Sequence, residues 1–284
     1  MIAYKISFDQ IRQQPALSSM LKALERGLFR FNIDYYLVGA VSRDVWMSGL
    51  NNITPRRATG DIDFAVYIND KGVYESLKEY LINTEGFKPY SGNAFVLRWK
   101  DGTEMDLLPF GAIEDENSRV TIQGTGYTSI NVDGFKEVFE EGLPELELNE
   151  AHRFKFCTIP GLVLLKLISW EDRPEVRRDD IKDICDLLYH FFDIYKEIIW
   201  QDHNDLFKNE EDDLINIAAC VLGKELRKIT FRNEKLFRRI GQLLVENTRN
   251  ATESKIAAIM IEYFNNTLED NVKMLKQIRK GLET

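Results

Sequence analysis

The sequence predicts an α+β fold, in which a mixed β-sheet with flanking helices in residues 1–159 is followed by an all-α helical bundle in residues 160–284. Two observations support this. Apolar patterns of strand type and of helix type are mixed in the first part, whereas only helical periodicity recurs after Pro160. The two parts meet without a linker rich in Gly, Ser or Pro. We therefore expect two domains that pack together and form a cleft.

The composition is that of a folded globular protein. Its 284 residues are 44% hydrophobic and 29% charged, far from the composition of disordered or collagen-like chains. The N-terminal residues lack the apolar core of a signal peptide, and the apolar runs are shorter than the roughly 20 residues that span a bilayer. We expect a soluble, cytoplasmic protein with no membrane partner.

Charge and cysteine content argue against a dedicated nucleic-acid-binding domain, a disulfide framework and a zinc site. The net charge of −9 is spread along the chain, so nucleic acid would have to bind to a local basic patch. The three cysteines form no CxxC pair, which predicts reduced, packed thiols rather than a disulfide framework or a zinc site.

The first part reads as alternating helices and strands, bounded by glycine and turn residues. Gly49 and Gly86 each follow a helical pattern, and the turn "KDG" joins two strand patterns as a hairpin. The predicted elements are helices over 18–31, 40–49 and 71–82, and strands over 35–38, 61–68, 94–99, 103–110, 145–149 and 153–159.

The second part is predicted to contain five or six helices. Pro160 stands at a suitable first helical position. Helical spacing of apolar residues then recurs over 160–170, 181–192, 211–226, 234–247, 253–264 and 271–282.

Two aspartates open one of the predicted strands. Alternation of side chains sends Asp61 and Asp63 to the same face, beside the apolar Phe64 and Val66. Neighbouring carboxylates repel each other, and their burial is costly without a compensating positive charge. Hard oxygen ligands suit Mg²⁺ or Mn²⁺, although a solvated strand end is the other interpretation of an isolated Asp-x-Asp pair.

A later strand offers a third carboxylate. Glu104 and Asp106 share one face of the strand predicted over 103–110. Two metal ions held by three carboxylates clamp the attacking and leaving oxygens in nucleotidyl transfer. Asp61, Asp63 and Asp106 are therefore the candidate metal ligands, with Asp106 also the candidate base and Glu104 its alternative.

The turn "LVGAVSRD" joins a predicted strand to a predicted helix. A glycine at position 39 lets a phosphate approach the backbone, where the first amides of a helix attract negative charge. Ser42 offers a hydroxyl and Arg43 offers charge-assisted hydrogen bonds to phosphate oxygens. The alternative is a structural glycine at a helix start with a surface pair of Arg43 and Asp44.

In combination, the glycine turn, the Asp-x-Asp strand and the later aspartate resemble the DNA polymerase β-type nucleotidyltransferase superfamily. Two of its branches are similar in this region. In one, the CCA-adding and poly(A) polymerases, the GGxVRD turn corresponds to Gly39, Ala40, Arg43 and Asp44, with alanine in place of the second glycine. The other is the AbiEii-type family, known as toxins of toxin–antitoxin and phage-defence systems.

The second part favours the AbiEii-type branch. Lys166 and Arg173 match its KxxAxxxR motif, with serine in place of alanine, and "KDICDL" over 182–187 matches its KDxxDL motif. Lys166 and Arg173, seven residues apart, would share one helix face and meet a triphosphate. Asp183 follows helical spacing with Asp179, Asp186 and His190, a polar stripe that a solvated helix face explains about as well as a site does. The resemblance turns Lys166 and Asp183 into candidate catalytic residues.

The resemblance implies a metal-dependent enzyme that transfers an NMP from an NTP to an acceptor hydroxyl. A tRNA acceptor would need a basic surface, which the segment over 223–241 offers, and a cognate antitoxin is a further implied partner. Rival interpretations are transfer to a small molecule such as an aminoglycoside, favoured by acids over 114–116, and an inactive fold that acts by binding.

Overall fold

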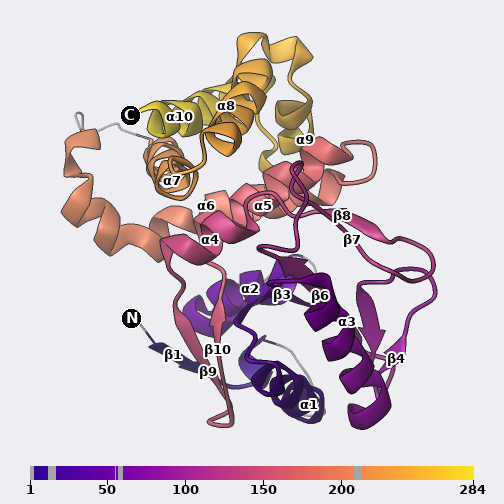
Figure 1. The fold of residues 1–284 in the computed structure, drawn as a ribbon. Coiled ribbons are helices and arrows are strands. Elements are labelled where there is room, and N and C mark those ends of the chain that lie inside the picture. The colour runs from indigo at the N-terminus through magenta and orange to yellow at the C-terminus, as the bar shows by residue number, and fades with distance from the viewer. Residues whose placement is uncertain (1–2, 12–16, 55, 57–59, 208–212) are drawn as a thin grey trace. The chain divides into compact units, whose positions relative to one another are not determined.

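The structure, a computed structural model, describes residues 3–11, 17–54, 56, 60–207 and 213–284. The chain divides into two compact units, Met1–Thr158 and Ile159–Thr284. The first contains a mixed sheet with flanking helices and the second is helical, so the predicted α+β fold class is confirmed (Figure 1).

The central sheet has eight strands in the order β1-β9-β10-β2-β3-β6-β5-β4. The pairs β1/β9, β10/β2 and β3/β6 are parallel and the other neighbours are antiparallel. Its strands are β1 (Ala3–Ile6), β2 (Tyr35–Val38), β3 (Ile62–Tyr67), β4 (Lys88–Pro89), β5 (Val96–Arg98), β6 (Glu104–Phe110), β9 (Glu145–Leu148) and β10 (His152–Phe156). A separate hairpin pairs β7 (Arg119–Thr121) with β8 (Ser129–Asn131).

The helices of the first unit follow the predicted pattern, with two differences. They are α1 (Leu17–Arg30), α2 (Gly39–Asp44), α3 (Lys71–Tyr80) and α4 (Phe135–Glu141). The helix predicted over 40–49 begins at Gly39 and widens into a π-helical turn over Val45–Leu50. Helix α4 was not predicted. The glycine stop at Gly86 is confirmed, since this residue has a left-handed φ of 87°.

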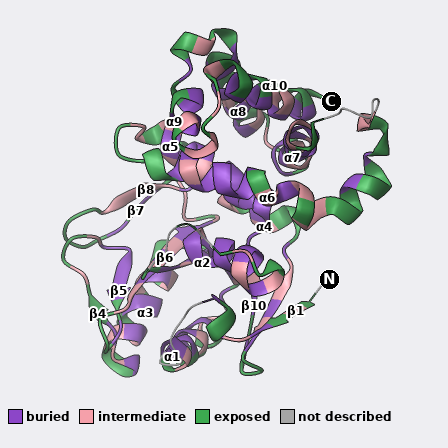
Figure 2. Cartoon of the chain, turned by 180° about the vertical axis from the view of Figure 1, so that it is seen from behind, coloured by how far each residue is buried: buried purple, intermediate pink, exposed green. Residues whose placement is uncertain are grey.

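The described second unit contains six helices, in agreement with the predicted number. They are α5 (Ile159–Asp172), α6 (Arg178–Asp202), α7 (Leu214–Thr230), α8 (Glu234–Arg249), α9 (Lys255–Phe264) and α10 (Leu268–Glu283). The backbones of α7 and α10 lie very close together at Gly281. A Cβ at this residue would lie only 1.9 Å from the Cys220 carbonyl oxygen, so no side chain fits there. Most of α5 is buried (Figure 2), as its uniformly apolar sequence requires.

All three cysteines are free and buried, as their spacing predicts. Within the described residues, no helix combines the length and the apolar composition needed to cross a membrane.

Candidate active site

Two of the predicted carboxylates lie opposite each other in the centre of the sheet. Strands β3 and β6 run parallel, and their register pairs Asp63 with Asp106. Side chains of directly paired residues project from the same face of a sheet, so both carboxylates share one face. Both residues are half-buried, whereas Asp61, one residue before β3, is exposed. The structure thus juxtaposes Asp63 and Asp106 and leaves Asp61 at the rim.

The structure also distinguishes Asp106 from its alternative, Glu104. The Glu104 carboxylate accepts a 2.8 Å hydrogen bond from Nε of Arg98 on the neighbouring strand, and the Arg98 guanidinium lies 4.0 Å from the centroid of the Tyr90 ring. Glu104 is therefore engaged in a cross-strand ion pair. Of the two acids on this face of β6, Asp106 is the one opposite Asp63.

The negative charge of Asp106 affects the pKa of Tyr74, a buried tyrosine of α3. The Tyr74 hydroxyl donates a 2.7 Å hydrogen bond to the Leu107 carbonyl oxygen. Burial raises the pKa of Tyr74 well above its ordinary value, and the negative charges of Glu75 and Asp106 raise it further. Tyr74 therefore stays protonated at neutral pH and holds α3 to β6.

Gly39 packs directly against the Asp63 carboxylate. The register of β2 and β3 pairs Val38 with Asp63, so the next residue, Gly39, begins α2 above that side chain. Gly39 has a φ of +67°, and a Cβ there would lie 2.0 Å from Oδ2 of Asp63. Conformation and space both require glycine at this position. Its backbone is half-buried and so remains partly accessible beside the carboxylate.

Gly39→Ala is expected to lower the free energy of unfolding by about 2–4 kcal/mol, from the left-handed backbone and from displacement of Asp63. Urea denaturation followed by circular dichroism measures the change. The matched control is Ala40→Gly, a small substitution at the next residue of the same helix, for which a loss of about 1 kcal/mol or less is expected. Equal stability of Gly39→Ala and wild type would contradict the close approach.

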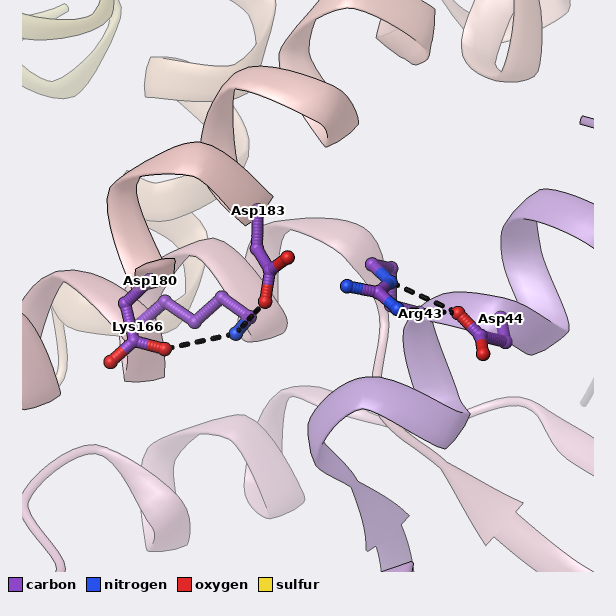
Figure 3. A network of polar contacts seen from close by, with 5 residues as sticks. All are labelled: Arg43, Asp44, Lys166, Asp180 and Asp183. Carbon is purple, nitrogen blue, oxygen red and sulfur yellow. Dashed lines mark hydrogen bonds and ion pairs between the residues drawn. The ribbon is translucent and has the colours of Figure 1, made fainter. Parts of the chain in front are cut away.

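Ser42 and Arg43 make contacts that the sequence did not predict. Ser42 is fully buried, and its hydroxyl donates a 3.2 Å hydrogen bond to the Cys157 carbonyl oxygen, which joins α2 to the end of β10. Arg43 is 1% exposed, and its Nη2 lies 2.8 Å from Oδ1 of Asp44 (Figure 3). The Arg43–Asp44 pair is therefore buried rather than on the surface. Triphosphate binding by either residue stays a prediction.

The donor set fits a hard divalent cation in part. Within the described ranges, no group of three His, Cys, Asp or Glu side chains is placed to hold a metal ion. Mg²⁺, however, is commonly bound by one or two carboxylates together with substrate phosphates. Asp63 and Asp106 supply such a pair, and the Asp63 carboxylate lies directly against the Gly39 backbone. A three-carboxylate site that includes Asp61 stays a prediction.

In the second unit, Lys166 is clamped between two aspartates. Its Nζ on α5 lies 2.7 Å from Oδ2 of Asp183 and 3.0 Å from Oδ1 of Asp180, both on α6 (Figure 3). Burial alone would lower the pKa of Lys166, but the charges of Asp183 and Asp180 outweigh it and raise the pKa. Lys166 is therefore positively charged at neutral pH and joins the two helices.

The polar stripe predicted on α6 is solvated only in part, since the side chain of Asp179 is 60% exposed but the aspartates that follow it are buried. Asp180, Asp183 and Asp186 are 8%, 5% and 4% exposed. Asp186 accepts a 2.7 Å hydrogen bond from the Tyr263 hydroxyl on α9. Asp180 was not among the predicted residues, although it lies three residues before Asp183, a spacing that places both on neighbouring positions of one helix face.

Arg173 lies one residue beyond the end of α5, the helix on which it was predicted to share a face with Lys166. Helix α5 ends at Asp172, and Arg173 begins the turn that leads into α6. Its carbonyl oxygen accepts hydrogen bonds from the Val176 and Arg177 amides. Prolines disfavour a helical conformation in the residue before them, and Pro174 gives the physical reason for the early stop.

Much of the basic charge over 223–241 is balanced locally. Nε and Nη2 of Arg239 lie 2.5 Å from Glu171 and 2.7 Å from Asp172, respectively, at the end of α5. Lys228 pairs with Glu225 at 2.6 Å, and Arg238 pairs with Glu234. These pairs reduce the positive charge available to a nucleic-acid backbone.

The acids predicted to attract a cationic substrate belong to turns. Glu114 accepts a 2.7 Å hydrogen bond from the Gly111 amide, and burial raises its pKa. Asp115 accepts hydrogen bonds of 2.9 Å from the amides of Asn117 and Arg119. These contacts explain both acids as loop stabilisers.

No family model and no curated protein match this chain. Solved structures give weak similarities. A nucleotidyltransferase-like antigenic protein from Paracoccidioides brasiliensis is 16% identical with a TM-score of 0.39, over 71% of this chain and 92% of that chain. The antibiotic-resistance factor ANT(2'')-Ia is 11% identical with a TM-score of 0.34, over 66% and 98%. The Thermotoga maritima CCA-adding enzyme, solved with tRNA, is 15% identical with a TM-score of 0.28, over 96% and 82%. Scores of this size do not establish a family.

Proposed function

We propose that this chain is a metal-dependent nucleotidyltransferase that moves an NMP from an NTP to an acceptor hydroxyl and releases pyrophosphate. The observation that supports the proposal most is the direct pairing of Asp63 and Asp106 on parallel strands, with Gly39 against the Asp63 carboxylate. Two acids side by side in a sheet repel each other, and a bound divalent cation would relieve that repulsion.

Each residue has a distinct role in this proposal. Asp106 orients the acceptor hydroxyl and takes its proton as the oxygen attacks the α-phosphorus. Gly39 lets α2 begin directly against the Asp63 carboxylate, and its partly accessible backbone would face the triphosphate. Asp63 and Asp106, with Asp61 beside them, would hold Mg²⁺ or Mn²⁺, which when bound neutralises charge on the phosphates.

The second unit has a supporting role in the proposal. Lys166 is held by Asp180 and Asp183, a cluster of one positive and two negative charges, which does not attract a triphosphate. We therefore assign Lys166 and Asp183 to positioning α5 against α6. Arg173, in the turn after α5, remains the candidate cation for the triphosphate.

The finer proposal is an AbiEii-type enzyme that acts on tRNA and is controlled by an antitoxin. It depends on the motif resemblance of Lys166, Arg173 and residues 182–187. Transfer to a small cationic acceptor is the competing candidate. The ion pairs of Arg239 favour it, because they reduce the positive charge that RNA binding would need.

The test is a transfer assay with the full chain. The protein is incubated with Mg²⁺ and each labelled NTP, with a tRNA pool in one arm and an aminoglycoside in the other. We expect label in one acceptor and release of pyrophosphate, and no transfer by Asp63→Asn.

The outcomes test three parts of the proposal separately: the enzymatic activity, the acceptor and the site residues. Label in tRNA supports the finer assignment, and label in the aminoglycoside replaces it. Absence of transfer in both arms together with absence of Mg–NTP binding would refute the enzymatic proposal. Transfer by Asp63→Asn at the wild-type rate would refute the assignment of the site.

A further inference from the structure

A pocket lies in the first unit, between the C-terminal part of α1, the start of β2 and the turn from β9 to β10. Its volume is about 410 Å³, within the range of small-molecule sites. The residues of this pocket that carry chemistry are Glu25, Phe29, Asp34, Tyr35 and Arg153. Tyr35 begins β2 and Gly39 follows its end, so the pocket and the Asp63–Asp106 pair are at opposite ends of that strand.

One wall of the pocket is a carboxylate held in place from behind. Nδ1 of His152 lies 3.0 Å and 3.1 Å from the two carboxylate oxygens of Glu25, and Nε2 of the same ring lies 2.8 Å from Oγ of Ser18. The His152 side chain is wholly buried, whereas that of Glu25 is 27% exposed. Ser18 and His152 therefore fix the orientation of an acid that faces the pocket, which lowers the entropy lost when a ligand binds.

The charge of the pocket is negative. Asp34 is exposed at its rim, and its carboxylate makes no hydrogen bond or ion pair with the described residues. The pocket also lies at the C-terminal end of α1, where the helix dipole favours cations. Arg153, the basic residue of the lining, donates a 2.8 Å hydrogen bond to Glu147, which also pairs with Lys5 at 2.9 Å, so the lining carries two acids and one base. Arg30 in the last turn of α1 lies over the Tyr80 ring instead.

The walls of the pocket also carry aromatic surface. Phe29 is 90% exposed at the edge of the pocket, so its ring is accessible to a ligand. Burial raises the pKa of Tyr35, and the negative charge of Glu25 raises it further, so this acid lies close to the phenol. Aromatic faces and carboxylates together select ligands that combine an apolar group with a positive charge.

We propose that this pocket binds a small organic cation, an amine with an aromatic or other apolar group, at the end of β2 opposite the Asp63–Asp106 pair. Glu25 and Asp34 contact the ammonium group, and Phe29 and Tyr35 contact the apolar part. The site is distinct from the proposed transfer site, and its existence does not depend on transfer activity.

Three probes of one shape test the charge requirement: 2-phenylethylamine as cation, 2-phenylethanol as neutral analogue and 3-phenylpropionate as anion. Binding to the full chain is measured by titration with ligand-observed NMR at neutral pH. We expect the amine to bind at least about tenfold more tightly than the alcohol, and the acid to bind more weakly than either.

Variants locate the binding site. Glu25→Gln removes the charge but keeps an oxygen that accepts from His152, and it is expected to weaken amine binding about tenfold. The matched control, Glu79→Gln on the exposed face of α3, makes the same charge change and should leave binding unaltered. If Glu25→Gln does not fold, Asp34→Asn and Phe29→Ala, both at exposed positions, are expected to weaken binding in its place. Equal binding of the three probes, absence of binding at millimolar concentration, or no effect of these variants would overturn the proposal.

Discussion

Replacement of Asp106 by asparagine is expected to reduce the rate of nucleotide transfer by about 10³-fold, equivalent to about 4 kcal/mol in the barrier. Asparagine has nearly the same shape, so the β3–β6 pairing remains, but it neither accepts the proton of the acceptor hydroxyl nor supplies a charged oxygen beside Asp63. The loss should appear in kcat, because Asp106 acts on the reacting oxygen. Steady-state release of pyrophosphate measures it.

Glu104→Gln is the matched control for this variant. It makes the same acid-to-amide change on the same face of β6, but Glu104 is paired with Arg98. Loss of an ion pair this exposed costs about 1 kcal/mol or less in stability and should leave the transfer rate within about threefold of wild type. A larger rate loss in Glu104→Gln than in Asp106→Asn would reverse the assignment of the two acids.

Replacement of Lys166 by methionine is expected to lower the free energy of unfolding by about 3–5 kcal/mol at pH 7, because Asp180 and Asp183 would be left buried without their cation. The pH dependence follows from the raised pKa of Lys166. The stabilisation that Lys166 gives is fully present below its unfolded-state pKa of about 10.4 and is lost as pH rises through the higher folded-state pKa. The difference between wild type and variant should therefore narrow in strong alkali. Urea denaturation of the full chain at a series of pH values measures this.

Lys182→Met controls for removal of a lysine from the same region. Lys182 is 42% exposed and pairs with Glu262 at 3.0 Å, so a loss of about 1 kcal/mol or less is expected. The double variant Lys166→Met/Asp183→Asn should recover part of the stability, since it removes one of the uncompensated charges. Similar losses in the two single lysine variants would show that the Lys166 cluster has no special stabilising role.

Local signals in the sequence predicted much of the sheet and the position of its acids. Nearly continuous apolar runs located the strands that carry Asp63 and Asp106, because a central strand has apolar residues on both faces and an acid interrupts such a run. Period two then predicted which face each acid occupies. Glycine at the end of β2 marked the turn, and the structure gives the reason, a carboxylate in the space of a side chain.

Contacts between distant parts of the chain were beyond prediction from the sequence. Ser42 looked available for phosphate because its partner, the Cys157 carbonyl oxygen, lies far along the chain. The aspartates of α6 looked solvated, since helical spacing shows which residues share a face but not that Lys166 lies against it. Strands such as β1 and β4 are too short to show alternation. Pairing with the neighbouring strands, rather than the residues of β1 and β4 themselves, determines that these segments are extended.

The register of β3 and β6 makes the proposed site a product of long-range assembly. Helix α3 and the strands β4 and β5 separate its two acids along the chain, so a nascent polypeptide that ends before β6 has no site at all. A slip of one residue would move Asp106 to the opposite face of the sheet and put its apolar neighbour in its place. The proposed site would thus form only when β3 and β6 pair in the correct register. A measurement of transfer activity would therefore also show whether the sheet is correctly folded.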